Sequence, residues 1–565
     1  MAIRSGAQII WESLMQEGVE VVFGYPGGTI LPAYDAMLSY PSIHHVLTRH
    51  EQGATHAADG YARASGKVGV AVATSGPGAT NMTTGIANAM LDSSPIVCIT
   101  GQVGTSVIGS DAFQEVDVTG VTLPITKHNY LVRRVEDLAG ILREAFHIAR
   151  SDRPGPVLVD IPKDVQIARC EFVYPDTPFT RPRHRSAKPL TEQLERALEW
   201  IHKAERPVIL AGHGVLLSGA IDELREFAEK TQVPVALTLL GLGVFPAQHP
   251  LCLGMMGMHG EAYANRAVQS ADLLIAMGMR FDDRVTGNLK TYAKQAKKIH
   301  IEIDPSEIAK NVRVDLPILA DLKAVLEQMN PRVVPGKYDA WRAQIAEWRA
   351  ETEARDIQQF DQSDKLLAPH VINDLWAATG GDALIVSDVG QNQMWEAQYY
   401  RHDSPRSLIT SGGLGTMGFA LPAAIGAKFA RPEAEVWVTV GDGGFQMTMP
   451  ELATMMQEKL KINIAILNNG FLGMVRQWQE FFYERRYAAT PILSPDFTKI
   501  AEAYGIEACR VTRRADVIPT IQMARQTPGP MLIDFRVEAE EAVYPMVPAG
   551  ADLHEMIRRP APVNS

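Results

Sequence analysis

Two strand-like runs near the end of the chain are each followed by residues suited to binding a metal ion. VWVTVGDGG (436–444) passes from a buried strand into a glycine turn, and INIAILNN (462–469) is the next strand-like run. If these strands are neighbours in a parallel sheet, Asp442 and Asn469 converge on one edge of it. Carboxylate and amide oxygens, with water and phosphate oxygens, suit octahedral Mg²⁺. Glycines let backbone N–H groups approach a diphosphate closely, and the turn offers Gly441, Gly443 and Gly444.

The plain alternative for GDG alone is a glycine-rich turn between a strand and a helix, with polar residues as caps. The order of the parts favours the metal and diphosphate site instead. A helix follows the turn, opened by Pro450 and Glu451, which suit a first helical turn. The second strand and its two asparagines then come where a metal site needs them.

An acid near the front of the chain is a second candidate. RHEQGATHAADGYARASG (49–66) places Glu51 ahead of a stretch of small residues, which predicts a closely packed helix. On its own, Glu51 is typical of a solvated acid at the start of a helix. A carboxylate protected from water at this position could instead exchange a proton with a bound ligand.

The elements that would position these residues indicate an α/β fold. VGVAVAT (68–74), the turn SGPG, a small-residue helix near 79–91 and the strand PIVCITG form a βαβ unit, which implies a parallel sheet. Further strand-like runs separated by helical patterns fill residues 191–330 and 366–545. We predict three doubly wound parallel-sheet domains with ligands beyond the carboxyl ends of the strands. The predicted units are 1–180, 190–335, 365–550 and a tail at 551–565, with connectors at 171–190 and 331–365.

Composition limits the function classes. The 565 residues carry a net charge of −11 without a Lys/Arg block, which argues against a nucleic-acid partner. No apolar run approaches the roughly 20 residues of a membrane span. The four cysteines are scattered, as in a protein of a reducing compartment. We therefore expect a soluble cytoplasmic protein with no membrane partner.

The GDGG and NN unit resembles the thiamine-diphosphate motif. That resemblance implies Mg²⁺ held by Asp442, Asn469 and the backbone carbonyl of Phe471. The loop DVGQNQMW (388–395) is similar to the second diphosphate-contacting loop, which implies contacts from Gly390, Gln391 and Asn392, the last standing where many relatives have His. RHEQGA with GYARASG resembles the signature of the activating glutamate, which implies that Glu51 bonds the pyrimidine N1′ across a subunit interface.

Eight strings spread over the chain are similar to biosynthetic acetohydroxyacid synthase large subunits. They are FGYPGG (23–28), DAFQE (111–115), GPVLVDIPKDV (155–165), GMHG (257–260), FDDRVTG (281–287), SGGLGTMGFALPAAIG (411–426), GMVRQWQ (473–479) and YPMVPAG (544–550). The resemblance implies decarboxylation of pyruvate and transfer of the two-carbon unit to a second pyruvate or to 2-oxobutyrate, in branched-chain amino-acid biosynthesis. It also implies a homodimer or homotetramer and a separate small regulatory subunit.

The same resemblance assigns roles to single residues. Around the coenzyme and the substrates it implies Gly28, Phe113, Gln114, Lys163, Met258, Met417, Met474 and Trp478, with Met417 beneath the coenzyme and Trp478 shaping the acceptor pocket. Around a structural FAD it implies Arg153, Gly212, Gly214, His259, Arg280, Asp283, Arg284, Glu302, Asp304 and Asp321. Taken singly, these residues are typical of ordinary core packing and surface ion pairs.

Three alternatives remain open from the sequence. A pyruvate oxidase type of FAD enzyme would share the fold and both cofactors, although GMVRQWQ and YPMVPAG argue against it. A catabolic acetolactate synthase would lack FAD. A scaffold without catalysis would have no need of Glu51, Asp442 and Asn469 together.

Overall fold

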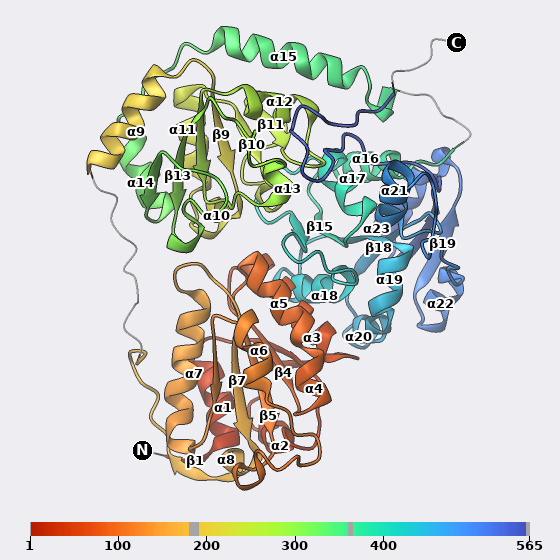
Figure 1. Ribbon diagram of the computed structural model, residues 1–565. Helices are drawn as coiled ribbons and strands as arrows, with labels where there is room; N and C mark the ends of the chain where they lie inside the picture. The colour runs from red at the N-terminus through yellow and green to blue at the C-terminus, as the bar shows by residue number, and fades with distance from the viewer. Residues whose placement is uncertain (1, 180–190, 360–364, 561–565) are drawn as a thin grey trace.

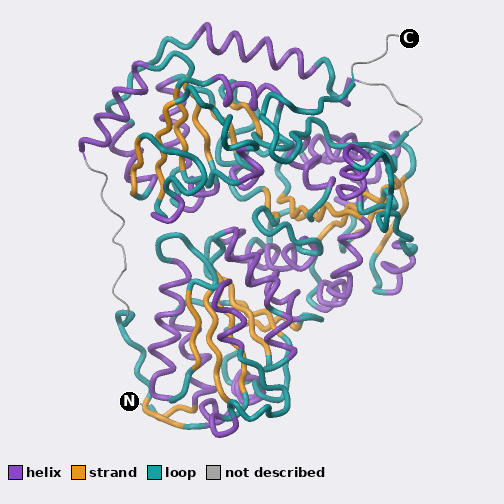
Figure 2. The backbone as a smooth tube through the Cα atoms, in the orientation of Figure 1, coloured by secondary structure: helices purple, strands orange, loops and turns teal. Residues whose placement is uncertain are grey.

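The computed structural model describes residues 2–179, 191–359 and 365–560. Three six-stranded sheets, each covered by helices, form three domains (Figures 1 and 2). All strand pairs within these three sheets are parallel. The predicted fold class is confirmed. The connectors 171–190 and 331–365 and the tail 551–565 lie partly outside the described residues.

The N-terminal sheet has the order β3-β2-β4-β5-β7-β6. Its strands are β2 (Val21–Gly24), β3 (His44–Leu47), β4 (Gly69–Ala73), β5 (Ile96–Gln102), β6 (His128–Leu131) and β7 (Val157–Pro162). Its helices are α1 (Gly6–Gln16), α2 (Leu31–Met37), α3 (Glu51–Ser65), α4 (Pro77–Asn81), α5 (Thr83–Asp92), α6 (Val118–Thr122), α7 (Val135–Arg150) and α8 (Lys163–Ile167). Two short strands, β1 (Ile3–Ser5) and β8 (Arg169–Glu171), pair antiparallel beside the sheet. The helix predicted near 79–91 is divided into α4 and α5, because the chain makes a tighter turn at Met82, whose N–H bonds Ala79.

The central sheet has the order β11-β10-β9-β12-β13-β14, which is the doubly wound order of Rossmann folds. Its strands are β9 (Pro207–Ala211), β10 (Val235–Leu237), β11 (Cys252–Met255), β12 (Leu273–Met277), β13 (Lys297–Glu302) and β14 (Leu316–Leu319). Its helices are α9 (Thr191–Lys203), α10 (His213–Leu217), α11 (Ile221–Thr231), α12 (Ala262–Ser270), α13 (Asp283–Thr286) and α14 (Leu322–Met329), and α15 (Asp339–Glu353) runs along its outer side (Figure 1).

The C-terminal sheet has the order β16-β15-β17-β18-β20-β19. Its strands are β15 (Leu384–Ser387), β16 (Leu408–Thr410), β17 (Val436–Gly441), β18 (Ile462–Asn468), β19 (Glu507–Val511) and β20 (Met531–Arg536). Its helices are α16 (Ala368–Thr379), α17 (Gln391–Tyr399), α18 (Ala420–Ala430), α19 (Asp442–Thr448), α20 (Leu452–Gln457), α21 (Gly473–Phe482), α22 (Phe497–Ala503) and α23 (Val517–Gln526). Counted within each domain, this strand order equals that of the N-terminal sheet.

The N-terminal and C-terminal domains pack through helices α3 and α18, which share one hydrophobic core. A Cβ added to Gly60 would lie 2.0 Å from the carbonyl oxygen of Ala423, and one added to Gly426 would lie 1.8 Å from that of Ala57. The two backbones therefore approach so closely that only glycine fits at these points. The small-residue stretch within 49–66, which predicted a closely packed helix, forms α3 and serves this crossing.

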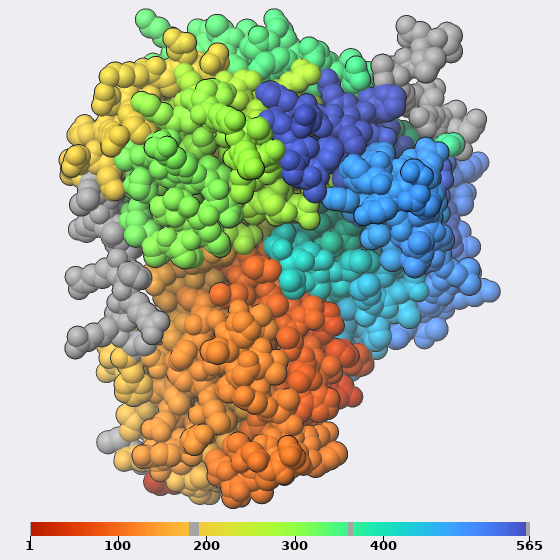
Figure 3. Space-filling model, in the orientation of Figure 1, coloured from red at the N-terminus to blue at the C-terminus, as the bar shows by residue number. Residues whose placement is uncertain are grey.

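The end of the chain returns to the central domain (Figure 3). Val547 and Leu553 are buried in the core of that domain, and the N–H of Val547 donates to the carbonyl of Met258 at 2.8 Å. Among the described residues, no helix combines the length and apolarity needed to cross a membrane.

Candidate active site

The GDGG turn (441–444) and the NN pair (468–469), together called the metal loop after their predicted role, meet where strands β17 and β18 lie side by side. Gly441 pairs with Leu467 in parallel register, so the two strands are the neighbours that the metal-site prediction required. Asp442 begins helix α19 and is fully buried. Its Oδ2 accepts a hydrogen bond from the Ser494 hydroxyl at 2.6 Å, whereas Oδ1 is buried without a partner in the described chain. Burial raises the pKa of Asp442, and the Ser494 bond opposes that rise.

Asn469 lies at the end of β18 and joins the metal loop to helix α17. Its Nδ2 donates to Gln391 Oε1 at 3.2 Å, and its Oδ1 accepts from the N–H of Phe471 at 3.1 Å. Gln391 in turn donates to Gln477 at 2.9 Å, which fixes its orientation. The predicted residues of the two diphosphate loops are therefore linked by hydrogen bonds.

Asp388, which follows β15, holds the turn that carries Met417. Its carboxylate accepts backbone N–H groups from Val389 at 2.9 Å and from Gly418 and Ala420 at 3.0 Å. Burial raises the pKa of Asp388 to about 6, against the effect of these bonds. A Cβ added to Gly443 would lie 3.6 Å from Met417 Cε, so Met417 reaches the metal loop.

Asn392 serves the same loops through the backbone. Its side-chain amide donates to the carbonyls of Asp388 at 2.8 Å and Thr439 at 3.3 Å. Its Oδ1 lies toward Gly390 and Gly441, at 2.9 and 3.5 Å from Cβ atoms added there. Asn392 therefore fastens β15 to β17 instead of presenting a free donor.

The predicted metal site does not rest on a cluster of acidic, histidine or cysteine side chains in the described part of the chain. Among the described residues, no group of three or more such side chains could hold a metal ion. A metal at this edge would depend on one carboxylate together with amide and backbone oxygens. Such a set suits Mg²⁺, which keeps water and phosphate oxygens as its other ligands.

Glu51 lies at the start of α3, with only 8% of its surface exposed. Its Oε2 accepts a hydrogen bond from Asn81 Nδ2 at 2.9 Å. The carboxylate of Glu451, from the C-terminal domain, accepts the backbone N–H groups of Arg49 at 3.0 Å and His50 at 3.1 Å. The segment that presents Glu51 is therefore held by its own domain and by the C-terminal domain.

Three other predicted residues lie on two segments that pack against the loop after β4, the loop whose Gly78 borders Glu51. The loop of Gly28 packs on Thr74, whose hydroxyl lies 3.0 Å from that of Thr29. Gln114, at a positive φ of 61°, lies against Gly76. Phe113 is 88% exposed, and Gly28 is exposed as well. Phe113 is therefore an exposed aromatic side chain on the segment that packs, through Gln114, against the loop after β4.

Lys163 also stands at an exposed edge, at the carboxyl end of β7. Within one chain, neither Lys163 nor Glu51 forms a hydrogen bond or ion pair with Asp442, Asn469 or Gln391 in the described residues. The N-terminal and C-terminal parts of the predicted site are each well formed, but within the described part of one chain no hydrogen bond or ion pair joins Glu51 or Lys163 to the predicted metal and diphosphate residues.

A cavity of about 790 Å³ lies where the three domains meet. It opens beyond the carboxyl ends of the central strands, the place where doubly wound sheets bind ligands. Most of the predicted FAD residues line it: Arg153, Gly214, His259, Arg280, Asp283, Arg284, Glu302 and Asp321. Gly390, Met417, Met474, Trp478 and Met258, predicted for the coenzyme and substrate, line the same cavity.

Two predicted FAD residues, Gly212 and Asp304, do not line the cavity. A Cβ added to Gly212 would lie 2.5 Å from the carbonyl oxygen of Gly278, so this glycine serves strand packing. Asp304 pairs with Arg153 at 3.1 Å and caps a short turn through Ser306. Each of the two residues thus contacts a residue that lines the cavity, Gly278 or Arg153, without lining it itself.

Of the three arginines that line the cavity, two have only loose ion pairs within the described chain. Arg153 is engaged by Asp304 and by Glu307 at 2.9 Å. Arg280 and Arg284, by contrast, have only loose ion pairs, with N···O distances of 3.8 Å to Asp282 and Asp283. Burial raises the pKa of Glu302 to about 7 and lowers that of His259 to about 4.

Helix α21 presents one face to the cavity. Met474, Val475 and Trp478 line the cavity, whereas Arg476 and Gln477 are fully buried on the other side. Arg476 pairs with Glu480 at 2.8 Å, and Gln477 binds the backbone of Val543. These bonds fix the rotation of the helix and hence the direction of Trp478.

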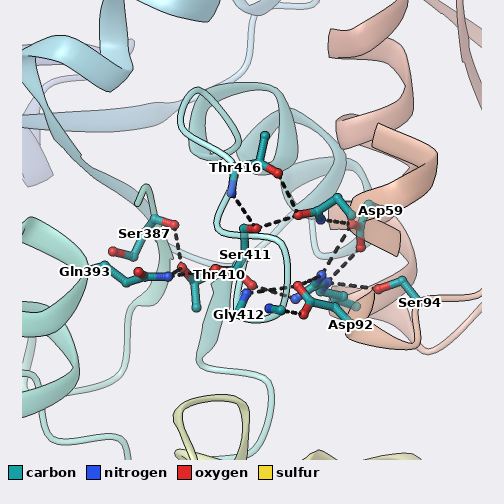
Figure 4. Close-up of polar contacts among 12 residues, drawn as sticks. Asp59, Asp92, Ser94, Ser387, Gln393, Thr410, Ser411, Gly412 and Thr416 are labelled. Atoms are coloured by element: carbon teal, nitrogen blue, oxygen red, sulfur yellow. Dashed lines mark hydrogen bonds and ion pairs between the residues drawn. The ribbon is translucent and has the colours of Figure 1, made fainter. Parts of the chain in front are cut away.

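A buried polar network joins the N-terminal domain to the 410–416 loop, which lies directly before Met417 (Figure 4). Arg63 pairs with Asp59 and Asp92, each at 2.7 Å. Asp92 accepts the N–H groups of Gly412 at 3.0 Å and Gly413 at 2.6 Å. From the loop, the hydroxyls of Ser411 and Thr416 donate to Asn88 Oδ1 at 2.5 and 3.1 Å. Burial favours a raised pKa for Asp59, but Arg63 and its other donors lower it overall.

Replacing Asp92 with alanine is expected to destabilise the protein by about 2 to 5 kcal/mol, because the buried N–H groups of Gly412 and Gly413 lose their acceptor and Arg63, which keeps Asp59, loses its second carboxylate. Urea unfolding of the variant and of wild type measures the difference. Asp137→Ala, at an exposed position on α7, is the control and should change stability by no more than about 0.5 kcal/mol. Equal unfolding curves for the Asp92 variant and the control would contradict this account.

Sequence reasoning missed several residues that organise the site. Asp388 begins the string DVGQNQMW and Asn81 lies in the helix predicted near 79–91. Neither position in the sequence indicates which residue is its partner. The sequence indicates Glu451 only as a first-turn residue, whereas its carboxylate accepts the backbone N–H groups of Arg49 and His50, directly before Glu51. Ser494 has no sequence signal and lies 52 positions from Asp442.

Comparisons with known proteins agree with the three-domain fold. Family models of the thiamine pyrophosphate enzymes match residues 4–121 (N-terminal TPP binding domain), 194–329 (central domain) and 388–535 (C-terminal TPP binding domain). The acetolactate synthase large subunit of Corynebacterium glutamicum is 49% identical over 561 residues, 97% of this chain and 89% of that protein. The acetolactate synthase large subunit of Lactococcus lactis is 47% identical over 559 residues, covering 98% and 96% of the two chains. The acetolactate synthase of Mycobacterium bovis is 49% identical over 570 residues, covering 98% and 91%.

Proposed function

Because the chain belongs to the acetolactate synthase large subunits, a family of thiamine pyrophosphate enzymes, we propose that the sites described above act together on two 2-keto acids. The enzyme decarboxylates pyruvate and joins the two-carbon unit to a second 2-keto acid. The product is 2-acetolactate, or 2-aceto-2-hydroxybutyrate when 2-oxobutyrate is the acceptor. This reaction is the first common step of valine, leucine and isoleucine biosynthesis.

One observation carries the assignment of the metal site: Asp442 Oδ1 is a buried carboxylate oxygen without a partner in the described chain. Leaving a buried carboxylate oxygen unpaired costs free energy. Such an oxygen is therefore expected where a bound ligand supplies the missing partner. Asp442, Asn469 and the backbone carbonyl of Phe471 would hold Mg²⁺, and Mg²⁺ would bind the diphosphate. Gly390, Gln391 and Asn392 would shape the second diphosphate loop.

The remaining residues would hold and use thiamine diphosphate, which supplies the electron sink for decarboxylation when bound. Glu51 would share a proton with the pyrimidine N1′. Met417 would support the coenzyme with its flexible thioether, since it lies between the metal loop and the cavity. Phe113, Gln114 and Lys163 would orient the acceptor and exclude water.

A second subunit would complete each site. Glu51, Gly28 and Phe113 belong to the N-terminal domain, and among the described residues of one chain none of them forms a hydrogen bond or ion pair with Asp442. The proposal is therefore a homodimer, or a homotetramer of such dimers, in which Glu51 of one subunit meets the metal loop of another. Two of the relatives are named as large subunits, and that name supports the proposal of a separate small regulatory subunit. A cytoplasmic location is proposed on the same family grounds.

FAD is proposed for the central cavity. The fit rests on the cavity volume of about 790 Å³, on its position beyond the strands of a Rossmann-type sheet, and on two loosely paired arginines. Arg280 and Arg284 would contact the FAD diphosphate. Glu302 would lie near the FAD as a neutral or charged acceptor, since its pKa is raised to about 7 by burial.

Replacing Arg280 with alanine is expected to weaken FAD binding about tenfold or more, because a hydrogen bond between charged groups contributes about 1.5 to 3 kcal/mol. Titration of the apoprotein with FAD, followed by flavin fluorescence, measures the affinity. Arg266→Ala is the matched control, because Arg266 pairs with Glu351 and does not line the cavity. Unchanged FAD affinity in the Arg280 variant would remove Arg280 from the flavin site.

Replacing Trp478 with leucine is expected to change the preference for 2-oxobutyrate over pyruvate as acceptor about tenfold, since one methylene contact is worth about 1 to 3 kcal/mol. The ratio of the two products from mixed substrates measures the preference. Phe481→Leu is the control on the same helix, because Phe481 stacks on Tyr544 and does not line the cavity. A product ratio unchanged from wild type would show that Trp478 does not face the acceptor.

One assay tests the proposed function as a whole. The purified protein is incubated with pyruvate, with and without thiamine diphosphate, Mg²⁺ and FAD, and the products are identified. Acetolactate that requires thiamine diphosphate and Mg²⁺ is the expected result. Flavin reduction by pyruvate without acetolactate would point to an oxidase and overturn the proposal.

A further inference from the structure

We propose that Asn81 is the positioning residue for Glu51: its amide holds one carboxylate oxygen and so directs the other toward the coenzyme. The inference deepens the proposed function and rests on the assigned role of Glu51. It concerns the orientation of the Glu51 carboxylate. Neither the fold nor the chemistry of a glutamate alone determines that orientation.

The only side-chain donor to the Glu51 carboxylate in the described chain is Asn81. Its Nδ2 lies 2.9 Å from Oε2, while Oε1 receives no donor. The neighbouring Thr55 hydroxyl donates to the backbone carbonyl of Glu51 at 2.8 Å and leaves the carboxylate untouched. One oxygen is thus fixed and the other remains available.

Gly78 lies beside the available oxygen. A Cβ added there would lie 3.2 Å from Glu51 Oε1 and 2.7 Å from Thr74 Cγ2, so a larger residue would crowd this place. Gly78 and Asn81 are three residues apart on α4 and therefore share a face of the helix. Helix α4 thus supplies both the donor to Oε2, which is Asn81, and a residue without a side chain beside Oε1, which is Gly78.

The chemical type of Asn81 suits this task. A carboxylate with 8% of its surface exposed has little water to orient it, so a single strong donor decides which way it points. An arginine or lysine in the same place would stabilise the charged form strongly and oppose sharing of a proton. A neutral amide orients the carboxylate and leaves it free to share a proton with a ring nitrogen.

The experiment compares Asn81→Leu, which keeps the approximate size but has no donor, with Asn81→Ala and with Asn81→Gln, which keeps the amide. Each full-length protein is loaded with thiamine diphosphate and Mg²⁺. Three quantities are measured: the rate at which the coenzyme C2 proton exchanges with deuterium, the dissociation constant of thiamine diphosphate, and the Tm. Thr80→Ala on the same helix is the control, because Thr80 is exposed and its hydroxyl bonds only the Pro77 carbonyl.

The expected result is an exchange rate reduced about 10- to 100-fold in the leucine and alanine variants, which corresponds to the loss of a hydrogen bond to a charged group. The dissociation constant should change less than about threefold, because Asn81 does not bind the diphosphate. Asn81→Gln should recover part of the exchange rate. The Thr80 control should resemble wild type in all three measurements.

Two outcomes would overturn the role of Asn81. One is an exchange rate within twofold of wild type in both donor-free variants. The other is a slower exchange that is matched by an equal loss of coenzyme affinity and of Tm, and is not recovered by Asn81→Gln, which is the behaviour of a merely structural residue. If Asn81→Leu does not fold, Asn81→Ala decides.

A parallel variant distinguishes an error in the role of Glu51 from an error in the role of Asn81. Glu51→Gln, measured in parallel, must lose the exchange if Glu51 is the activating acid. Retained exchange in Glu51→Gln would overturn the assignment of Glu51 and, with it, this proposal. Lost exchange in Glu51→Gln together with normal exchange in the Asn81 variants would overturn the role of Asn81 alone.

Discussion

Replacing Glu51 with alanine is expected to lower kcat by about 10² to 10⁴, because an acid that exchanges a proton at the reacting coenzyme contributes on this scale. The side chain makes one hydrogen bond, to Asn81, so the fold should persist. Steady-state kinetics and the Tm of the variant give the two readings. Coenzyme affinity should change little, because the proposed diphosphate contacts come from the C-terminal domain and not from Glu51.

Glu192→Ala is the matched control, because Glu192 is also a first-turn acid but is exposed at the start of α9. It should retain wild-type kcat. A Glu51→Ala protein with the kcat of wild type would end the proposed mechanism. A Glu51→Ala protein that does not fold would leave Glu51→Gln, which keeps the size and the hydrogen-bonding oxygen, as the variant for the same measurement.

Replacing Asp442 with asparagine is expected to separate stability from function. The apoprotein should gain about 1 to 3 kcal/mol of stability, because the change removes a buried charge with one unpaired oxygen. Activity should fall by more than the roughly 10- to 100-fold typical of residues that only support a metal ligand. Addition of thiamine diphosphate and Mg²⁺ should raise the Tm of wild type but not of the variant.

Thermal unfolding with and without the two ligands measures both effects of the Asp442 substitution. Asp534→Asn is a useful comparison, because Asp534 is fully buried but has partners in Asn468, Arg510 and Arg536. That variant should lose stability in the apoprotein. If Asp442→Asn were also destabilised and still gained Tm on addition of Mg²⁺, Asp442 would not be the metal ligand.

The sequence was most informative where one strand or helix carries the signal by itself. The buried strand before GDGG, the strand before NN and their parallel pairing follow from hydrophobic runs and from the rule for doubly wound sheets. The helix over 51–65 follows from its small residues, and the structure shows their purpose at the crossing of α3 and α18.

The sequence was least informative where two side chains from distant segments meet. Asn81 and Glu51 are 30 positions apart, and Asp92 and Gly412 are 320 apart. Such pairs depend on the relative placement of domains, which a hydrophobic pattern does not encode. Most of the predicted FAD residues line one cavity, but Gly212 and Asp304 stand behind its wall, because strand packing and an ion pair to Arg153 occupy them.

The central claim is that an acid of one subunit and the metal loop of another share one coenzyme, and hybrids of two inactive variants test it most directly. Glu51→Ala and Asp442→Ala chains, each with its own affinity tag, are produced together, and the hybrids are isolated through both tags. In the proposed arrangement one site of each hybrid dimer has both residues intact, so the hybrids should regain about a quarter to a half of wild-type activity. Hybrids no more active than either single variant would contradict the account, because every site would then contain one of the two substitutions.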